Sequence, residues 1–159
     1  MSSTTLAALK TKPKFVFFSD FDGTITQSDS NDYLTDNFGF GYALRRQANQ
    51  DVLEGKCTFR ESLQLMMDSI KMPYDQCIKT LLGNIKLDPF FLDFYEYCSK
   101  ENIPIVILSG GMEPIIRTLL VNLVGEEAKN IQIVSNNVAP RPGKKIDEEG
   151  GWQIVFHDE

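Results

Sequence analysis

Short, continuous apolar runs alternate along the chain with longer stretches in which apolar positions recur every three or four residues. Residues 15–18, 103–108 and 131–134 are the continuous runs, a pattern typical of strands that are buried on both faces of a sheet. Residues 28–102 and 114–124, which separate these runs, have mostly helical spacing. Strands separated by helices predict a parallel α/β sheet, here with a long helical insert after the first strand.

Start signals for helices lie within the insert and just after it. Thr58 and Glu61 have the spacing of a capping box ahead of a helix. Pro73 fits the first turn of the next helix. Asp88 is the predicted N-cap of a further helix, and Pro89 is its predicted first residue.

A β-hairpin is predicted after the third strand. Residues 138–139 and 152–156 are its expected arms, and the polar residues 141–151 form its tip. Trp152 is expected to cover the apolar side of this hairpin.

Composition and charge limit the classes of function. The chain has 159 residues, of which 42% are hydrophobic and 24% charged, values that are ordinary for a single folded domain. A net charge of −6 disfavours a general nucleic-acid binder. No apolar run approaches the length of a membrane-spanning helix, about 20 residues. The three cysteines, Cys57, Cys77 and Cys98, form no CxxC pair, so we expect a protein of the reducing cytoplasm. From the charge and the short apolar runs we expect no nucleic-acid or membrane partner.

Two aspartates directly follow the first predicted strand. Asp20 and Asp22 are two positions apart, so on an extended segment they face the same side, and a pair of close carboxylates favours a cation such as Mg²⁺ between them. A carboxylate here is also a candidate nucleophile toward phosphorus. An aspartate-rich turn that only caps the next segment is the alternative. A calcium loop of the EF-hand type is excluded, because its glycine and glutamate positions hold Ile25 and Asn31.

A second polar cluster, residues 109–111, follows the second predicted strand. The hydroxyl of Ser109 and free backbone N–H groups near a helix N-terminus are typical of an anion site, although a simple glycine turn between strand and helix has the same sequence. Right-handed crossover connections bring the ends of successive parallel strands close together. The two clusters are therefore expected to meet at one edge of the sheet.

Together these clusters resemble the motifs of the haloacid dehalogenase (HAD) superfamily. Residues 20–24 and 109–111 match its first two motifs, and the helical insert resembles the C1 cap of the phosphoserine-phosphatase-like branch. Residues 29–33 and 134–136 are most similar to fungal cytosolic members of that branch, and the resemblance covers residues 14–159.

The resemblance implies a three-layer, Rossmann-like α/β fold with a parallel sheet and a mostly helical cap inserted after the first strand. The expected division is a flexible N-terminal tail (residues 1–13), a core (14–27 and 88–159) and a cap (28–87). The core is expected to be incomplete at its C-terminal end.

The implied function is that of a Mg²⁺-dependent phosphatase-like hydrolase acting on a small phosphorylated metabolite. By resemblance, Asp20 is the nucleophile that becomes aspartyl-phosphate, and Asp22 is the general acid–base. By the same resemblance, Asp20 and the backbone carbonyl of Asp22 bind Mg²⁺, while Thr24, Ser109 and Gly110 bind the phosphoryl group.

Three cap residues are candidates for substrate contact: Asp29, Phe59 and Arg60. Phosphoserine phosphatases carry an arginine seven residues after the phenylalanine that matches Phe59, whereas this chain has Met66 there. Phosphoserine is therefore not the expected substrate, and Arg60 is the candidate for a different anionic group.

The family's later motifs supply a phosphate-binding lysine and further acidic Mg²⁺ ligands after a fourth strand, and no such strand follows before Glu159. Lys144, Lys145 and Asp147 are expected to be solvated turn charges instead. The alternative function is thus a truncated or inactive HAD-like protein that binds phosphate or a protein partner without turnover. The first strand, residues 15–18, is left as an apolar sheet edge, which predicts self-association.

Three further basic residues are expected to have no role in a site. Arg45 and Arg46 are predicted to lie on a solvated helix face, and His157 in an exposed tail.

Overall fold

The computed structural model describes residues 7–158, which form a sheet, the helices that flank it and a helical cap at one end. The first six residues of the expected tail and Glu159 lie outside the described residues. The strands are β1 (Phe17–Ser19), β2 (Ile105–Met112), β3 (Gln132–Pro140) and β4 (Trp152–Val155). The helices are α1 (Ser30–Phe38), α2 (Tyr42–Leu53), α3 (Phe59–Ser69), α4 (Tyr74–Asn84), α5 (Phe91–Lys100) and α6 (Glu113–Leu123), with 3₁₀ turns η1 (Ala7–Leu9) and η2 (Glu126–Asn130).

The four described strands form one sheet in the order β1-β2-β3-β4. The β1–β2 and β2–β3 pairs are parallel, with Phe17 opposite Ile105 and Ile107 opposite Ile133. The β3–β4 pair is antiparallel. The predicted α/β class is confirmed, including the helical insertion between the first and second strands and the hairpin at the end.

Two strands are longer than predicted. β2 does not end before Ser109 but continues to Met112, with a shift of register after Leu108. Small residues without a bulky side chain permit such an irregularity in place of a turn. β3 is also one continuous strand, so the third strand and the first hairpin arm, predicted as separate segments, are parts of the same element.

The prediction that the first strand is buried on both faces was wrong. Among the described strands, β1 pairs with β2 alone and lies at the sheet edge, and Phe17 and Phe18 are 41% and 54% exposed. Phe17 packs against Phe94 of α5, with ring centroids 5.0 Å apart, while Phe18 lacks comparable cover. An apolar run indicates a strand, but the neighbours that bury it come from elsewhere in the chain.

The helices begin at or near the predicted signals. Thr58 and Glu61 form the predicted capping box at the start of α3. Pro73 is the N-cap of α4 instead of a residue of its first turn. The predicted start of the next helix was also early, because the Asp88 side chain accepts a hydrogen bond from the Phe90 N–H in a turn before α5.

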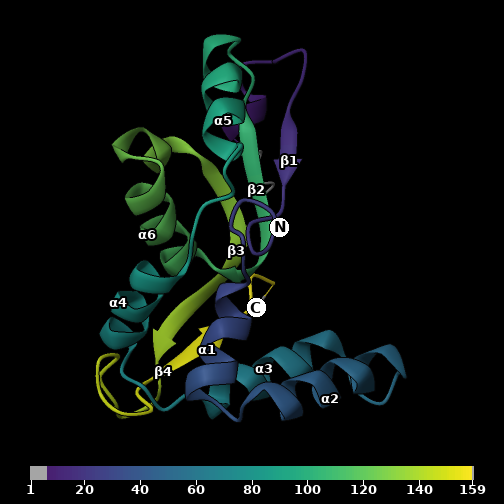
Figure 1. Cartoon of the computed structure of the whole chain (residues 1–159), viewed down its shortest axis with the longest axis vertical. Helices are drawn as coiled ribbons and strands as arrows, with labels where there is room; N and C mark the ends of the chain where they lie inside the picture. Colours follow the sequence, from purple (N-terminus) through teal and green to yellow (C-terminus); the bar gives the residue numbers. More distant parts are fainter. Residues whose placement is uncertain (1–6, 159) are drawn as a thin grey trace.

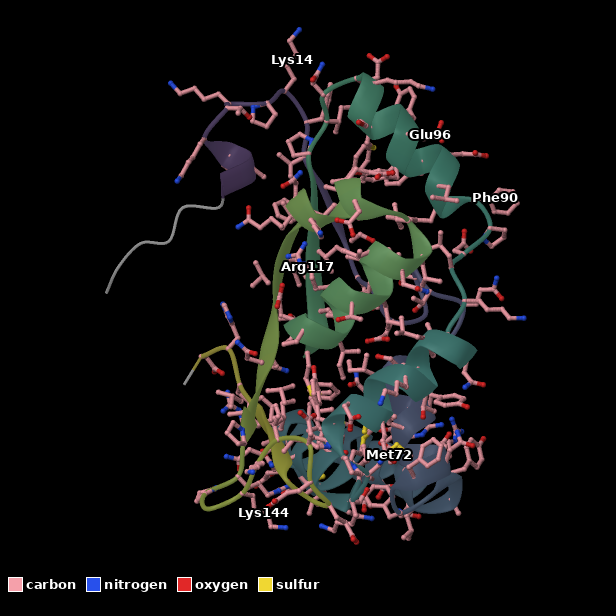
Figure 2. All side chains as sticks on the ribbon, turned by 90° about the vertical axis from the view of Figure 1, so that its left-hand side faces the viewer. Lys14, Met72, Phe90, Glu96, Arg117 and Lys144 are labelled. Carbon is pink, nitrogen blue, oxygen red and sulfur yellow. The ribbon has the colours of Figure 1, made fainter. Side chains whose placement is uncertain are left out.

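The cap helices α1, α2 and α3 gather at the end of the molecule opposite to α5, below the carboxyl end of the first strand (Figure 1). α6 lies between β2 and β3 in sequence and packs on the sheet, with Arg117 on the face toward the viewer in Figure 2. The Arg117 guanidinium donates to the carbonyl oxygens of Lys129 and Ile131, at 2.9 and 2.7 Å, and so joins α6 to the start of β3.

The β3–β4 hairpin is attached to the cap. Trp152 is 1% exposed, and its Nε1–H donates to the Met72 carbonyl at 2.9 Å. The Gly150 N–H donates to the Lys71 carbonyl at 2.7 Å, beside the same α3–α4 junction. Burial of Trp152 agrees with its predicted role, and the contacts fix the hairpin against the base of the cap.

Candidate active site

A tight loop after β1 directs two aspartates away from the core. Phe21 lies between them and is fully buried, and its carbonyl accepts hydrogen bonds from the N–H groups of the next residues, Thr24 to Thr26. Gly23 has φ +73°, a conformation that residues with a β-carbon rarely adopt. Because Phe21 anchors the loop, Asp20 and Asp22 both reach the cavity beside it.

This cavity has a volume of about 270 Å³ and lies between the sheet and the cap. Its core side is formed by the loop after β1 and the last part of β2, and its cap side by polar residues of the α1 and α2 region and apolar residues of α3. The lining residues are Asp20, Asp22, Asp29, Asn31, Asp32, Asn49, Phe59, Leu63, Met66, Ser109, Gly110 and Gly111. The structure therefore brings together the two motifs that the sequence placed at neighbouring strand ends.

Asp22 is the more enclosed of the two loop aspartates. Its carboxylate accepts hydrogen bonds from the Ser30 N–H at 2.7 Å and from the Asn31 side-chain amide at 3.4 Å. Burial raises the pKa of Asp22 to about 7, the nearby Asp29 charge adds to the rise, and the hydrogen bonds from Ser30 oppose it. A carboxyl group with a pKa near neutrality can both give and take a proton.

The Ser109–Gly111 segment lies opposite these carboxylates. The Ser109 hydroxyl accepts a hydrogen bond from the Gly111 N–H at 3.0 Å. The Asn136 amide of β3 donates to the Gly110 carbonyl at 2.8 Å and accepts from the His157 N–H at 3.1 Å. Asn136 therefore fixes the orientation of the Gly110 peptide next to the cavity.

On the cap side, Asp29 is both a lining residue and the N-cap of α1. Its carboxylate accepts a hydrogen bond from the Asp32 N–H at 2.9 Å. Burial raises the pKa of Asp29, and backbone hydrogen bonds and the positive charge of Arg45 act in the opposite direction. Asp32 also lines the cavity, and burial together with the Asp29 charge raises its pKa to about 6 although Arg45 lowers it.

The sequence reasoning missed part of this wall. Asn31, Asp32 and Asn49 line the cavity and were not singled out. Arg45 was expected on a solvated helix face, and this was wrong, because only 7% of it is exposed and it pairs with Asp32 and Asp36. The spacing of Asp32 and Asp36, four residues apart on α1, was the available signal for a buried cation.

Two candidate residues lie outside the cavity. Thr24 is exposed and lies in the wall of a different depression, next to Phe90 and Phe94. Arg60 is stacked over the Phe156 ring, 4.3 Å from its centroid, and forms an ion pair with Asp158. Phe59 and Asp29, in contrast, are lining residues as expected.

The tip of the hairpin has the predicted solvated charges. Lys144 and Lys145 are exposed, and the Lys144 ammonium donates to the Glu149 carbonyl at 2.9 Å. Asp147 is exposed and accepts from the Asp75 N–H at 3.0 Å. Among the described residues, no lysine, arginine or histidine lines the cavity.

The donor set of the loop fits Mg²⁺. The Asp20 carboxylate and the backbone carbonyl of Asp22 are hard oxygen ligands on one short loop beside the cavity. Within residues 7–158, no three acidic, histidine or cysteine side chains converge as a ready-made cage. Mg²⁺ commonly uses one or two carboxylates and retains several water molecules, so a cage is not required.

Two fungal proteins are similar in sequence to most of this chain. "Pdp3-interacting factor 1" of Schizosaccharomyces pombe is 48% identical over 149 residues, which are 93% of this chain and 62% of that protein. "Polyol phosphate phosphatase PYP1" of Saccharomyces cerevisiae is 44% identical over 147 residues, which are 92% of this chain and 58% of that protein. The chain thus spans about three-fifths of the length of these two fungal relatives.

Solved structures show the same fold. A HAD family hydrolase of Salmonella enterica serovar Typhi superimposes with a TM-score of 0.66 at 17% identity, over 91% of this chain and 44% of that one. A substrate-bound phosphoserine phosphatase gives a TM-score of 0.65 at 14% identity, over 89% of this chain and 63% of that one.

In the part of the chain described, none of the helices has both the length and the apolar character needed to cross a bilayer.

Residues 17–156 match the sequence profile of the haloacid dehalogenase-like hydrolases. This match spans nearly the whole chain, includes both motifs at the cavity, and agrees with the fold and with the two fungal relatives. The chain therefore belongs to the haloacid dehalogenase-like hydrolase family.

Proposed function

We propose that the protein is a Mg²⁺-dependent phosphomonoesterase that acts on a small phosphorylated metabolite through an aspartyl-phosphate at Asp20. The observation that carries the proposal is the shared cavity, in which Asp20 and Asp22, just after β1, face the Ser109–Gly111 segment of the adjacent strand β2. Asp22, with a pKa raised to about 7 by burial, is suited to exchange protons at neutral pH.

In the proposed reaction, a carboxylate oxygen of Asp20 attacks phosphorus, and the ester P–O bond to the leaving group breaks. Asp22, in its protonated form, gives its proton to the leaving alkoxide. A water molecule then attacks the phosphorus of the aspartyl-phosphate and gives its proton to Asp22, the P–O bond to Asp20 breaks, and inorganic phosphate and the free Asp20 carboxylate result. The Ser109 hydroxyl and backbone N–H groups nearby hold the phosphoryl oxygens. The Asp20 carboxylate and the backbone carbonyl of Asp22 would hold Mg²⁺, which would neutralise phosphoryl charge.

The cap side of the cavity supports a polyol phosphate as the substrate. Carboxylates and amides, including Asp29 and Asn49, accept hydrogen bonds from hydroxyl groups, and Phe59 and Met66 provide apolar surface for carbon atoms. One of the fungal relatives carries the name polyol phosphate phosphatase. Met66, 5% exposed in the wall, offers no positive charge for the carboxylate of phosphoserine.

Release of inorganic phosphate from a panel of polyol, sugar and amino-acid phosphates, with Mg²⁺ present, tests this function. Polyol phosphates are expected to be the preferred substrates, and Asp20→Asn is expected to lower the rate by at least about 10³-fold. Asp93→Asn, an exposed carboxylate on α5, is the matched control and should leave the rate unchanged. Activity that survives Asp20→Asn would refute the nucleophile.

A second function, binding of phosphate without turnover, is favoured by one observation. None of the described lysine, arginine or histidine side chains lines the cavity to neutralise a phosphoryl group. If calorimetry detects phosphate binding while the whole panel releases no phosphate, this second function replaces the first.

We also infer a reducing, cytoplasmic environment. The thiols of Cys57, Cys77 and Cys98 are all free, and two of them are buried.

A further inference from the structure

Arg45 lies inside the cap and has no role in the proposed reaction. Its Nε and one Nη donate to both carboxylate oxygens of Asp36, at 2.6 and 2.8 Å. Its other Nη lies 2.6 Å from Oδ2 of Asp32. The guanidinium also lies over the Tyr42 ring, 5.3 Å from the centroid. A guanidinium that is bidentate, stacked and buried has one fixed orientation, so it holds Asp32 in one place.

The two carboxylates that Arg45 binds differ in what they face. Asp32 lines the cavity, whereas Asp36 does not. The Asp32 side chain is also the more exposed, at 35% against 22%. An ionised carboxylate accepts hydrogen bonds and donates none, so at a substrate wall it attracts hydroxyl groups and repels other carboxylates. Since Arg45 already orders Asp32, a ligand gains these contacts without the cost of immobilising the side chain.

We infer that Asp32, positioned by Arg45, is a specificity-determining residue that binds hydroxyl groups of the substrate's leaving group. The inference rests on the proposed function, because it assigns the leaving group of that reaction to the cap side of the cavity. A merely structural Arg45 would only join α1 to α2, and its loss would then weaken the binding of all ligands by the same factor.

Two ligands of equal carbon number separate these cases. Erythritol 4-phosphate carries a hydroxyl on every carbon that lacks the phosphate, and n-butyl phosphate carries none. Their dissociation constants are measured by calorimetry with Mg²⁺ on whole chains that all carry Asp20→Asn, the background called wild type in this comparison, so that neither ligand is hydrolysed during the titration. The wild-type protein is expected to bind erythritol 4-phosphate at least about 10-fold more tightly than n-butyl phosphate.

Each variant is judged by the ratio of its dissociation constants for n-butyl phosphate and erythritol 4-phosphate. Asp32→Ala should bring the ratio close to one by weakening only the erythritol 4-phosphate complex. Arg45→Gln should do the same, and Arg45→Lys should restore part of the ratio. Arg46→Gln, an exposed neighbour on the same helix, is the control and should keep the wild-type ratio. If Arg45→Gln fails to fold, Asp32→Ala decides the question alone.

Three results would each overturn the inference. The wild type could bind both ligands equally, the ratio could be unchanged in Asp32→Ala, or a folded Arg45→Gln could bind both ligands more weakly by the same factor. Failure of the proposed function looks different. In that case the ratio and its loss in Asp32→Ala are observed, but the chain with Asp20 intact releases no phosphate from erythritol 4-phosphate.

Discussion

Gly111 and Asp22 are so closely packed that a methyl group on Gly111 would lie 3.0 Å from Oδ2 of the carboxylate. The same methyl would lie 3.3 Å from Oγ of Ser109. Gly111→Ala is therefore expected to displace the Asp22 carboxylate and to lower the rate of phosphate release at least about 10-fold, since small displacements of reacting groups are costly.

The control for this substitution is Gly83→Ala on α4, where no atom lies within 4 Å of the added methyl. It should keep full activity and stabilise the helix by about 0.5–1 kcal/mol. Equal activity in Gly111→Ala and the wild type would contradict the close packing.

The stability of the Mg²⁺-free protein is expected to fall as pH rises from about 4 to about 7, the range between the ordinary pKa of an aspartate and the raised pKa values. Burial raises the pKa of Asp22 to about 7 and that of Asp32 to about 6, both above the ordinary value of 3.8. The folded state then holds protons more tightly than the unfolded state, so its advantage is complete below the unfolded pKa and is lost as pH rises through the folded one.

Urea unfolding at pH 5 and pH 8 measures this effect. Asp22→Asn should remove much of the difference between the two pH values, and Mg²⁺ should stabilise the wild type more at pH 8, where the carboxylates are ionised. An identical difference in Asp22→Asn and the wild type would show that another group is responsible.

Trp152→Phe is expected to lower the free energy of unfolding by about 1–3 kcal/mol. The substitution removes the buried indole N–H that donates a hydrogen bond to the Met72 carbonyl. Chemical denaturation followed by circular dichroism checks this value. Phe90→Ala, at a ring that is 74% exposed, should change stability by no more than about 0.5 kcal/mol. Similar losses in both variants would argue against a special role for the hairpin contact.

The exposed β1 edge is expected to make the isolated chain self-associate. Phe15 and Phe18 are 67% and 54% exposed, and β1 has a strand partner on one side only among the described residues. Phe18→Lys should reduce the apparent mass in light scattering at high concentration. Leu53→Lys makes a comparable change at an 82% exposed position of α2 and should have no effect. A concentration-independent monomer in the wild type would contradict this expectation.

The sequence predicted local features of the chain better than the surroundings of each strand. The spacing of Asp20 and Asp22 around Phe21 was enough to predict one shared cavity, since the local backbone alone decides which way these side chains point. The capping box of Thr58 and Glu61 is local as well and was confirmed.

The errors concern properties that depend on distant parts of the chain. Exposure of Phe18 follows from which strands lie beside β1, and burial of Arg45 follows from the approach of α1 to α2. The continuation of β2 past Ser109 depends on pairing with β3, as Met112 lies opposite Asn136. None of these can be read from the periodicity of a short segment.

The two hydrogen bonds of Asn136 have a mechanical consequence. One amide side chain joins the Gly110 peptide to the segment after β4, and β4 belongs to the hairpin that is attached to the cap at Met72. A displacement of the hairpin at Met72 would therefore act on the Gly110 peptide in the cavity wall, because Asn136 joins the two by hydrogen bonds.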